Sequence, residues 1–233
     1  EHIMFKGTRN FGTIDAAKEA VLLDSIQNRF EVYRTLKDSL QRRAYYQQID
    51  SLSQLAAKYF IPNEYDKLMS SIGAEGTNAY TSNDVTCYVE DIPANELENW
   101  AKIESDRFQN MVIRGFHTEL EAVYEEYNIS LGNDNRKLFA ALNAMLFPGH
   151  PYGTQTTIGT QEHLKNPSIV NIKNYFSRYY VPNNTAICMA GDFDPDKAIA
   201  IIDKYFGTWK PNPNLSQPEY APIPERTAPA DTT

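Results

Sequence analysis

The first two residues of the chain, Glu1 and His2, place a carboxylate directly beside an imidazole. A neutral imidazole is a common metal ligand, and a carboxylate beside a bound ion can accept a proton and return it. Zinc sites combine such histidines with carboxylates from other segments. The pair therefore predicts zinc chemistry. Because the chain does not begin with Met, we expect it to be a fragment or a processed product.

A second acidic group lies in the stretch TELEAVYEEYN. In a helix each residue advances by about 100°, so Glu119 and Glu126 would share one face with the small apolar Ala-Val pair between them. Glu121 and Glu125 would lie together on the other side, as a solvated acidic face. The apolar neighbours indicate that the first face is turned inward, where a carboxylate needs a cation or a hydrogen-bond partner.

Composition narrows the class of protein. With 233 residues and 42% hydrophobic content, the chain is long enough to bury a substantial core. The net charge of −8 and the lack of a basic cluster exclude nucleic acid as a partner. No apolar run approaches the roughly 20 residues of a transmembrane segment. Cys87 and Cys188 each lie in an apolar run that is typical of small buried thiols.

Hydrophobic periodicity predicts an α+β fold with a mixed or antiparallel sheet packed against helices. Apolar residues at three- and four-residue steps predict a helical hairpin over about 14–61, closed by Pro62. VTCYV (85–89) and TAICMA (185–190) are typical of strands. The further predicted helices begin near Asn95, near Thr118, at Asn166 and Pro167, and at Asp194 and Pro195, the last ending at Gly207. The proline-rich residues 211–233 predict an extended linker.

EHIMFKGT resembles the second half of the inverted zinc motif H-x-x-E-H of the insulinase/pitrilysin family of metallopeptidases. Further segments follow in the order of that family: GTNAYTSND (76–84), ELEAVYEE (119–126), HPYG (150–153), YYVPNNTAICMAGDFD (179–194) and YFGTW (205–209). The segments span nearly the whole chain, which is therefore identified as a member of this family.

The resemblance implies a domain like those of the mitochondrial processing peptidase over residues 1–210, truncated inside its metal motif. The stretch between His2 and Glu126 is longer than is usual in the family. The helical hairpin of about 14–61 explains the difference and resembles an insertion in a bacterial branch, with packing, a dimer contact or gating as its role. Residues 211–233 would lead to a missing C-terminal domain.

The resemblance also implies the roles of the site residues. His2 matches the second zinc-binding histidine and Glu1 the general base. Glu126 matches the third ligand, with Glu125 as the alternative, and Glu119 matches a second glutamate that supports the site and could orient a ligand histidine. The first zinc histidine of the motif would lie three positions before Glu1, so we expect this fragment to bind zinc poorly and to be inactive.

Substrate binding follows from the same resemblance. Asn78, Ala79 and Tyr80 would lie on an exposed sheet edge, where a peptide adds as a strand. Without the family, the segment would be an ordinary glycine-flanked edge strand. His150 is interpreted as a capping or loop residue, and His117 and His163 as surface or capping residues.

The full-length parent is therefore expected to be a zinc metalloendopeptidase that hydrolyses peptides or unfolded polypeptides. The alternative is a paralogue that has lost zinc and binds peptides or scaffolds a complex. A C-terminal domain or a partner subunit of the same family is the expected partner, with a homodimer as a further possibility. Analogy with bacterial relatives suggests the periplasm or the cell envelope.

Overall fold

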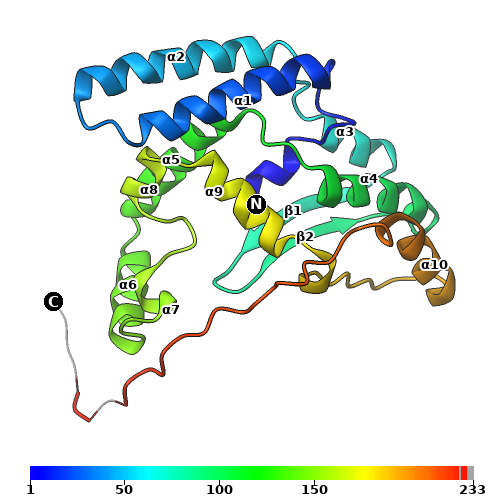
Figure 1. Cartoon of the computed structure of the whole chain (residues 1–233). Coiled ribbons are helices and arrows are strands. Elements are labelled where there is room, and N and C mark those ends of the chain that lie inside the picture. Colours follow the sequence, from blue (N-terminus) through cyan, green and yellow to red (C-terminus); the bar gives the residue numbers. More distant parts are fainter. Residues whose placement is uncertain (226, 230–233) are drawn as a thin grey trace.

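A helical hairpin forms the first large unit of the structure, a computed structural model that describes residues 1–225 and 227–229. Helix α1 (Ala16–Tyr33) and helix α2 (Ser39–Ala57) lie side by side across one side of the molecule (Figure 1). Asp15 and Asp38 cap the two helices, because each side chain accepts a hydrogen bond from a backbone N–H in the first turn. The hairpin predicted over 14–61 is confirmed.

The remaining elements follow the hairpin in chain order. After the 3₁₀ turn η1 (His2–Phe5) and the hairpin come α3 (Glu64–Ser71), β1 (Glu75–Thr81), β2 (Thr86–Asp91), η2 (Ala94–Glu96), α4 (Leu97–Asn110), α5 (Phe116–Leu131), α6 (Asp134–Leu146), α7 (Pro151–Thr154), α8 (Gln161–Lys165), α9 (Ile169–Tyr179), η3 (Pro182–Asn184) and α10 (Pro195–Phe206). None of the helices in the described ranges has both the length and the apolar character that crossing a membrane requires.

The sheet of the described residues is small. β1 and β2 pair antiparallel, with Tyr80 opposite Cys87 and Thr81 opposite Thr86, and an irregularity interrupts the register between Glu75 and Asn78. The predicted α+β class is confirmed, as a mostly helical chain with a two-stranded antiparallel sheet.

The core joins the hairpin to α5 and α9. Phe30 of α1 is fully buried and meets Phe116, the first residue of α5, edge to face with 5.3 Å between ring centroids. Ile49 of α2 is fully buried in the same cluster, and Ile169 at the start of α9 is 4% exposed. The hairpin therefore packs against the helix that carries Glu119 and Glu126.

One strand prediction is wrong. Residues 185–190, TAICMA, belong to no strand, since a strand needs a ladder partner and the described residues give this segment none. The expectation that both cysteines are buried is also wrong. Cys188, in this segment, is exposed, and Cys87, in β2, is only half-buried.

Two helix starts also differ from the sequence pattern. Helix α4 begins at Leu97, after the turn η2, and Asn95 makes no cap. Helix α9 begins at Ile169, where the hydroxyl of Ser168 accepts the capping bond, and Asn166 instead follows the end of α8. The start of α10 is as predicted, with Asp194 as cap and Pro195 in the first turn.

The segment after α10 has no regular secondary structure over 211–225 and 227–229. Its one aromatic contact is made by Tyr220, whose ring lies 4.7 Å from that of His150. The rest of the predicted linker, residues 226 and 230–233, lies outside the described residues.

We predict that Phe30→Ala lowers the free energy of unfolding by about 3–5 kcal/mol, because it leaves a cavity where α1 meets α5. Val21→Ala, on the exposed side of the same helix, is the matched control and should change it by less than about 0.5 kcal/mol. Urea denaturation followed by circular dichroism measures both. Equal losses in the two variants would contradict the placement of the core.

Candidate metal centre

His2 and Glu119 meet although they are far apart in the sequence. The imidazole Nδ1 lies 2.6 Å from one carboxylate oxygen of Glu119, and the Lys6 ammonium lies 2.5 Å from the other. His2 belongs to the turn η1 and Glu119 to the first turns of α5. The contact therefore joins the start of the chain to the helix that carries the second predicted acid.

The pKa values of this pair shift in opposite directions. The hydrogen bond from His2, assisted by Lys6, lowers the pKa of Glu119 to about 2, although burial opposes the shift. The hydrogen bond with Glu119 raises the pKa of His2, and the negative charges of Glu119, Glu126 and Glu1 add to this. Since ionised Glu119 can only accept, Nδ1 of His2 carries the proton. In neutral His2 the lone pair then resides on Nε2, which bonds to none of the described residues.

Glu1 is held at the end of strand β1. One of its carboxylate oxygens accepts a 2.6 Å hydrogen bond from the hydroxyl of Thr81. Asn78, Ala79 and Tyr80 precede Thr81 on the same strand, with Asn78 and Tyr80 exposed and Ala79 half-buried. The structure thus brings the predicted acid to the strand that was predicted to bind peptide.

Glu126 lies on the same side of α5 as Glu119, close enough for its charge to contribute to the raised pKa of His2. The expectation that this whole face is turned inward is wrong. Glu119 is half-buried, but Glu126 and Ala122 are exposed, because the core packs against the beginning of α5 and not against its second half. Glu125, the alternative ligand, is exposed as well.

The donor set suits zinc in kind. A histidine whose Nδ1–H is bound by a carboxylate and whose Nε2 is free is the usual arrangement of a zinc-binding imidazole. The carboxylate of Glu126 is of the right kind to serve as a second zinc ligand beside His2. Within the described ranges, however, no group of three or more His, Cys, Asp or Glu side chains is arranged to hold a metal ion.

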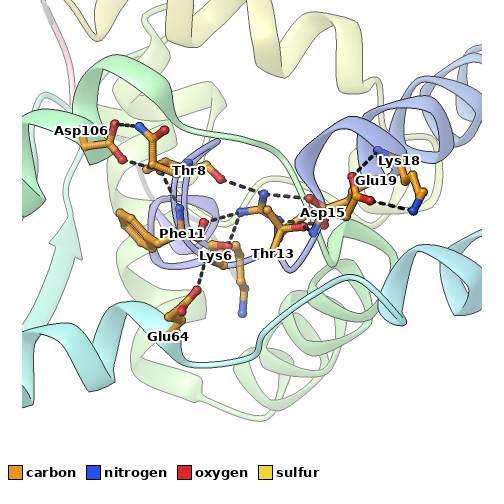
Figure 2. A network of polar contacts seen from close by, with 12 residues as sticks. Lys6, Thr8, Phe11, Thr13, Asp15, Lys18, Glu19, Glu64 and Asp106 are labelled. Atoms are coloured by element: carbon orange, nitrogen blue, oxygen red, sulfur yellow. Dashed lines mark hydrogen bonds and ion pairs between the residues drawn. The ribbon is translucent and has the colours of Figure 1, made fainter.

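The segment after His2 is fixed by Arg114, a buried residue that the motifs of the sequence do not identify. Its guanidinium forms a bidentate ion pair with the carboxylate of Glu19 in α1, and both N···O distances are 2.9 Å. It also donates to the backbone carbonyls of Lys6, Thr8 and Phe11 at 2.9, 2.8 and 3.3 Å. Figure 2 shows Lys6, Thr8, Phe11 and Glu19 within one polar network. Arg114 thereby ties residues 6–11 to α1 and to the start of α5.

Two glycines permit this close wrapping. Gly7 and Gly12 have φ values of +92° and +88°. A Cβ on Gly12 would lie 2.7 Å from an Arg114 nitrogen and 2.8 Å from the carbonyl oxygen of Lys6. A side chain at Gly7 would lie 2.6 Å from the carbonyl oxygen of Phe11. Both positions therefore require glycine for backbone conformation and for space.

A second buried arginine holds the sheet against α4. The Arg107 side chain is fully buried and pairs with Glu104 of its own helix at 2.5 Å and with Glu90 of β2 at 3.1 Å. The Tyr65 hydroxyl lies within hydrogen-bond distance of both carboxylates, 3.0 Å from Glu90 and 2.9 Å from Glu104, and can donate its one proton to either. These bonds fix β2, and through it β1 and Thr81, relative to the helices.

The other histidines lie outside this centre. His150 caps α7, because its Nδ1 accepts from the backbone N–H of Tyr152, and His163 is exposed, both as predicted. The interpretation of His117 as a surface or capping residue is wrong. Its side chain is 9% exposed and lies 3.5 Å from Asp50 and 3.7 Å from Glu121, because α2 of the hairpin covers the first turn of α5.

The arginine was missed because its signal depends on contacts between distant segments. Arg114 is a lone cation in the apolar stretch MVIRGF, which indicates a buried charge that needs an acid. The two glycines of GTRNFGT indicate a tight turn. Neither pattern identifies Glu19 as the partner.

Comparison with known sequences gives partial matches. The family model described as "Peptidase M16 inactive domain" matches residues 169–232. An uncharacterised zinc protease of Mycobacterium leprae is 26% identical over 60% of this chain and 32% of its own length. The zinc protease PqqE of Helicobacter pylori is 24% identical over 73% of this chain and 40% of its own length.

Solved structures agree with these matches. A protease from Helicobacter pylori superposes with a TM-score of 0.62 and 26% identity, over 70% of this chain and 40% of that one. The first half of the periplasmic protease PqqL from Escherichia coli gives a TM-score of 0.61 at 20% identity, over 70% and 36%, and supports the fold. The chain thus spans less than half the length of these relatives. The family resemblance that the motifs predicted is confirmed.

We predict that Gly12→Ala lowers the free energy of unfolding by about 1–3 kcal/mol more than Gly76→Ala does. Gly76 also has a positive φ, of +63°, but nothing lies within 4 Å of a Cβ there. The control therefore carries the backbone strain without the overlap with Arg114. Chemical denaturation measures the free energy of unfolding of both variants. Equal losses would show that the backbone around Arg114 leaves room for a side chain at position 12.

We predict an acid-dependent stability contribution from Glu119 in metal-free protein. Its folded pKa of about 2 lies below the ordinary value of 4.5, so the stabilisation is present above about pH 4.5 and is lost as the pH falls towards 2. The unfolding free energies of wild type and Glu119→Gln should differ most from about pH 5 up to the raised pKa of His2, which lies above 6.5, and should converge towards pH 2. Glu125→Gln, at an exposed position, is the control; a pH-independent Glu119 difference would contradict the pairing.

Proposed function

We propose that this relative of the insulinase/pitrilysin zinc proteases provides part of the catalytic centre of a zinc metalloendopeptidase that cleaves peptides or unfolded polypeptides. The observation that carries the proposal is the 2.6 Å contact between Nδ1 of His2 and Glu119, which leaves Nε2 of His2 available to a metal ion, with Glu126 and Glu1 close enough for their charges to raise the pKa of His2. Both sequence relatives named above are described as zinc proteases.

We assign His2 Nε2 and Glu126 as zinc ligands, and Glu119 as the carboxylate that orients His2. When bound, zinc polarises the scissile carbonyl and activates water. Glu1 uses one carboxylate oxygen to accept the bond from Thr81, which leaves the other oxygen to accept a proton from the attacking water and to return it to the leaving amine. Glu119 stays ionised and keeps the proton of His2 on Nδ1.

The substrate would add as a strand along β1, where Asn78, Ala79 and Tyr80 lead directly to Thr81 and Glu1. Backbone pairing accepts many sequences, so side-chain selectivity along this strand should be loose. This placement brings a bound peptide bond close to the acid without any further rearrangement of the strand.

The wider organisation is also a proposal. Residues 1–210 would form the zinc-peptidase domain, with the helical hairpin as its insertion, and residues 211–233 would lead to a second domain. The protease PqqL, whose first half matches this fold, is periplasmic, which supports an envelope location. A non-catalytic, peptide-binding subunit is the competing function, and the match of residues 169–232 to an inactive-domain model favours it.

The ligand assignment predicts a specific order of zinc affinities. In a longer form that includes the residue three positions before Glu1, His2→Ala and Glu126→Gln should abolish stoichiometric zinc binding in a calorimetric titration. Glu119→Gln should weaken it by about 10–100-fold, because the orienting bond is lost. Glu125→Gln, one residue away from the assigned ligand, is the matched control and should bind as wild type. Loss of zinc in Glu125→Gln but not in Glu126→Gln would reverse the assignment.

The mechanism predicts that Glu1→Gln in the longer form retains zinc but loses cleavage of a quenched fluorescent peptide. A chelator should abolish the wild-type activity. The chain on its own should show no zinc-dependent cleavage, because the described residues offer too few ligands. Unchanged turnover in Glu1→Gln would end this mechanism, and a longer form that binds no zinc would favour the non-catalytic alternative.

A further inference from the structure

A large groove lies beside the His2 centre. It has a volume of about 1120 Å³ and runs between α1, α2, α9 and the segment that joins α4 to α5. Its lining includes Lys6 and Glu119, the ion pair that contacts His2. The groove therefore reaches the face of α5 on which the candidate centre is built.

One wall of the groove is aromatic. Phe108, Phe176, Tyr180 and Trp209 line it and are all half-buried. The ring of Phe108 lies 5.7 Å from that of Trp209 and 6.2 Å from that of Tyr180, which forms a continuous surface. Such partly exposed aromatic surface favours the binding of apolar side chains.

The groove also carries unpaired positive charge. Arg9, Lys173 and Lys210 line it, are exposed, and form no ion pair within the described residues. The acids that share the lining are largely neutralised: Glu19 pairs with Arg114, and Glu119 pairs with Lys6 and His2. Asp24 is the remaining acid. On a chain with a net charge of −8, this groove is thus a local site for anions.

The arrangement of the cations favours a peptide over other anionic ligands. Arg9 lies in the loop after η1, Lys173 on α9 and Lys210 after α10, so the charges come from three separate segments. A fatty acid offers a single carboxylate, and nucleic acid binding draws on denser clusters of cations. A peptide can present several carboxylates, with apolar side chains between them.

We propose that this groove binds an acidic stretch of the polypeptide substrate, with its carboxylates at Arg9, Lys173 and Lys210 and its apolar side chains on the aromatic wall. The identification of the bound peptide as substrate rests on the proposed peptidase function. The groove then selects substrates by charge at a distance from the cleaved bond, whereas strand addition at β1 accepts many sequences.

Fluorescence anisotropy with this chain tests the proposal. The probe is a labelled peptide of about twelve residues in which Glu alternates with Leu and Phe. Lys173→Glu combined with Lys210→Glu should weaken binding by roughly tenfold or more. Lys67→Glu combined with Lys102→Glu makes the same charge change at exposed positions outside the groove and should stay within about twofold of wild type.

A second probe, with Gln in place of every Glu, should bind roughly tenfold more weakly to wild type. Equal binding of both peptides, equal effects of the two double variants, or no binding of the acidic probe would overturn the proposal. Because this measurement needs neither zinc nor turnover, its failure is distinct from failure of the peptidase function. The zinc titration addresses that function separately.

Discussion

The candidate centre depends on the hydrogen bonds that the Arg114 guanidinium makes to Glu19 and to the backbone after His2. One buried guanidinium binds Glu19 of α1 and three carbonyls of the segment that follows His2, and it lies two residues before α5. Removing one partner of such a buried pair costs about 3–5 kcal/mol. The helical hairpin, the first turn of the chain and the helix with Glu119 are thereby held in one arrangement, and the contact between His2 and Glu119 follows from it.

The ion pairs around His2 both hold the surrounding segments together and determine which imidazole nitrogen carries the proton. Two charged groups near His2 are paired: buried Arg114 binds Glu19, and half-buried Glu119 binds Lys6 and His2. Ionised Glu119 fixes the imidazole proton on Nδ1, so the lone pair of neutral His2 resides on Nε2, while the charges of Glu126 and Glu1 act on the same imidazole. The neighbouring groove differs, because its exposed cations are unpaired among the described residues. The paired charges around His2 thus hold the candidate centre in place, whereas the unpaired cations of the groove are available to bind an anionic ligand.

Local patterns predicted the elements well and their contacts poorly. The periodicity of 14–61 and of TELEAVYEEYN is visible in the sequence, and both segments are helical. TAICMA has the composition of a strand but no ladder partner in the described residues, and pairing cannot be deduced from composition. The motif pointed to His2 and Glu119, yet Arg114 was missed, since its meaning depends on Glu19 in another helix. The burial of His117 likewise depends on the packing of α2 against α5.

The most direct test of the account is an anomalous diffraction map at the zinc edge, from crystals of a longer form that includes the residue three positions before Glu1. We expect one peak in contact with both Nε2 of His2 and the carboxylate of Glu126, with Glu119 bonded to the other imidazole nitrogen. A peak bound by Glu119 in place of Glu126, or an ion that does not touch His2, would contradict it.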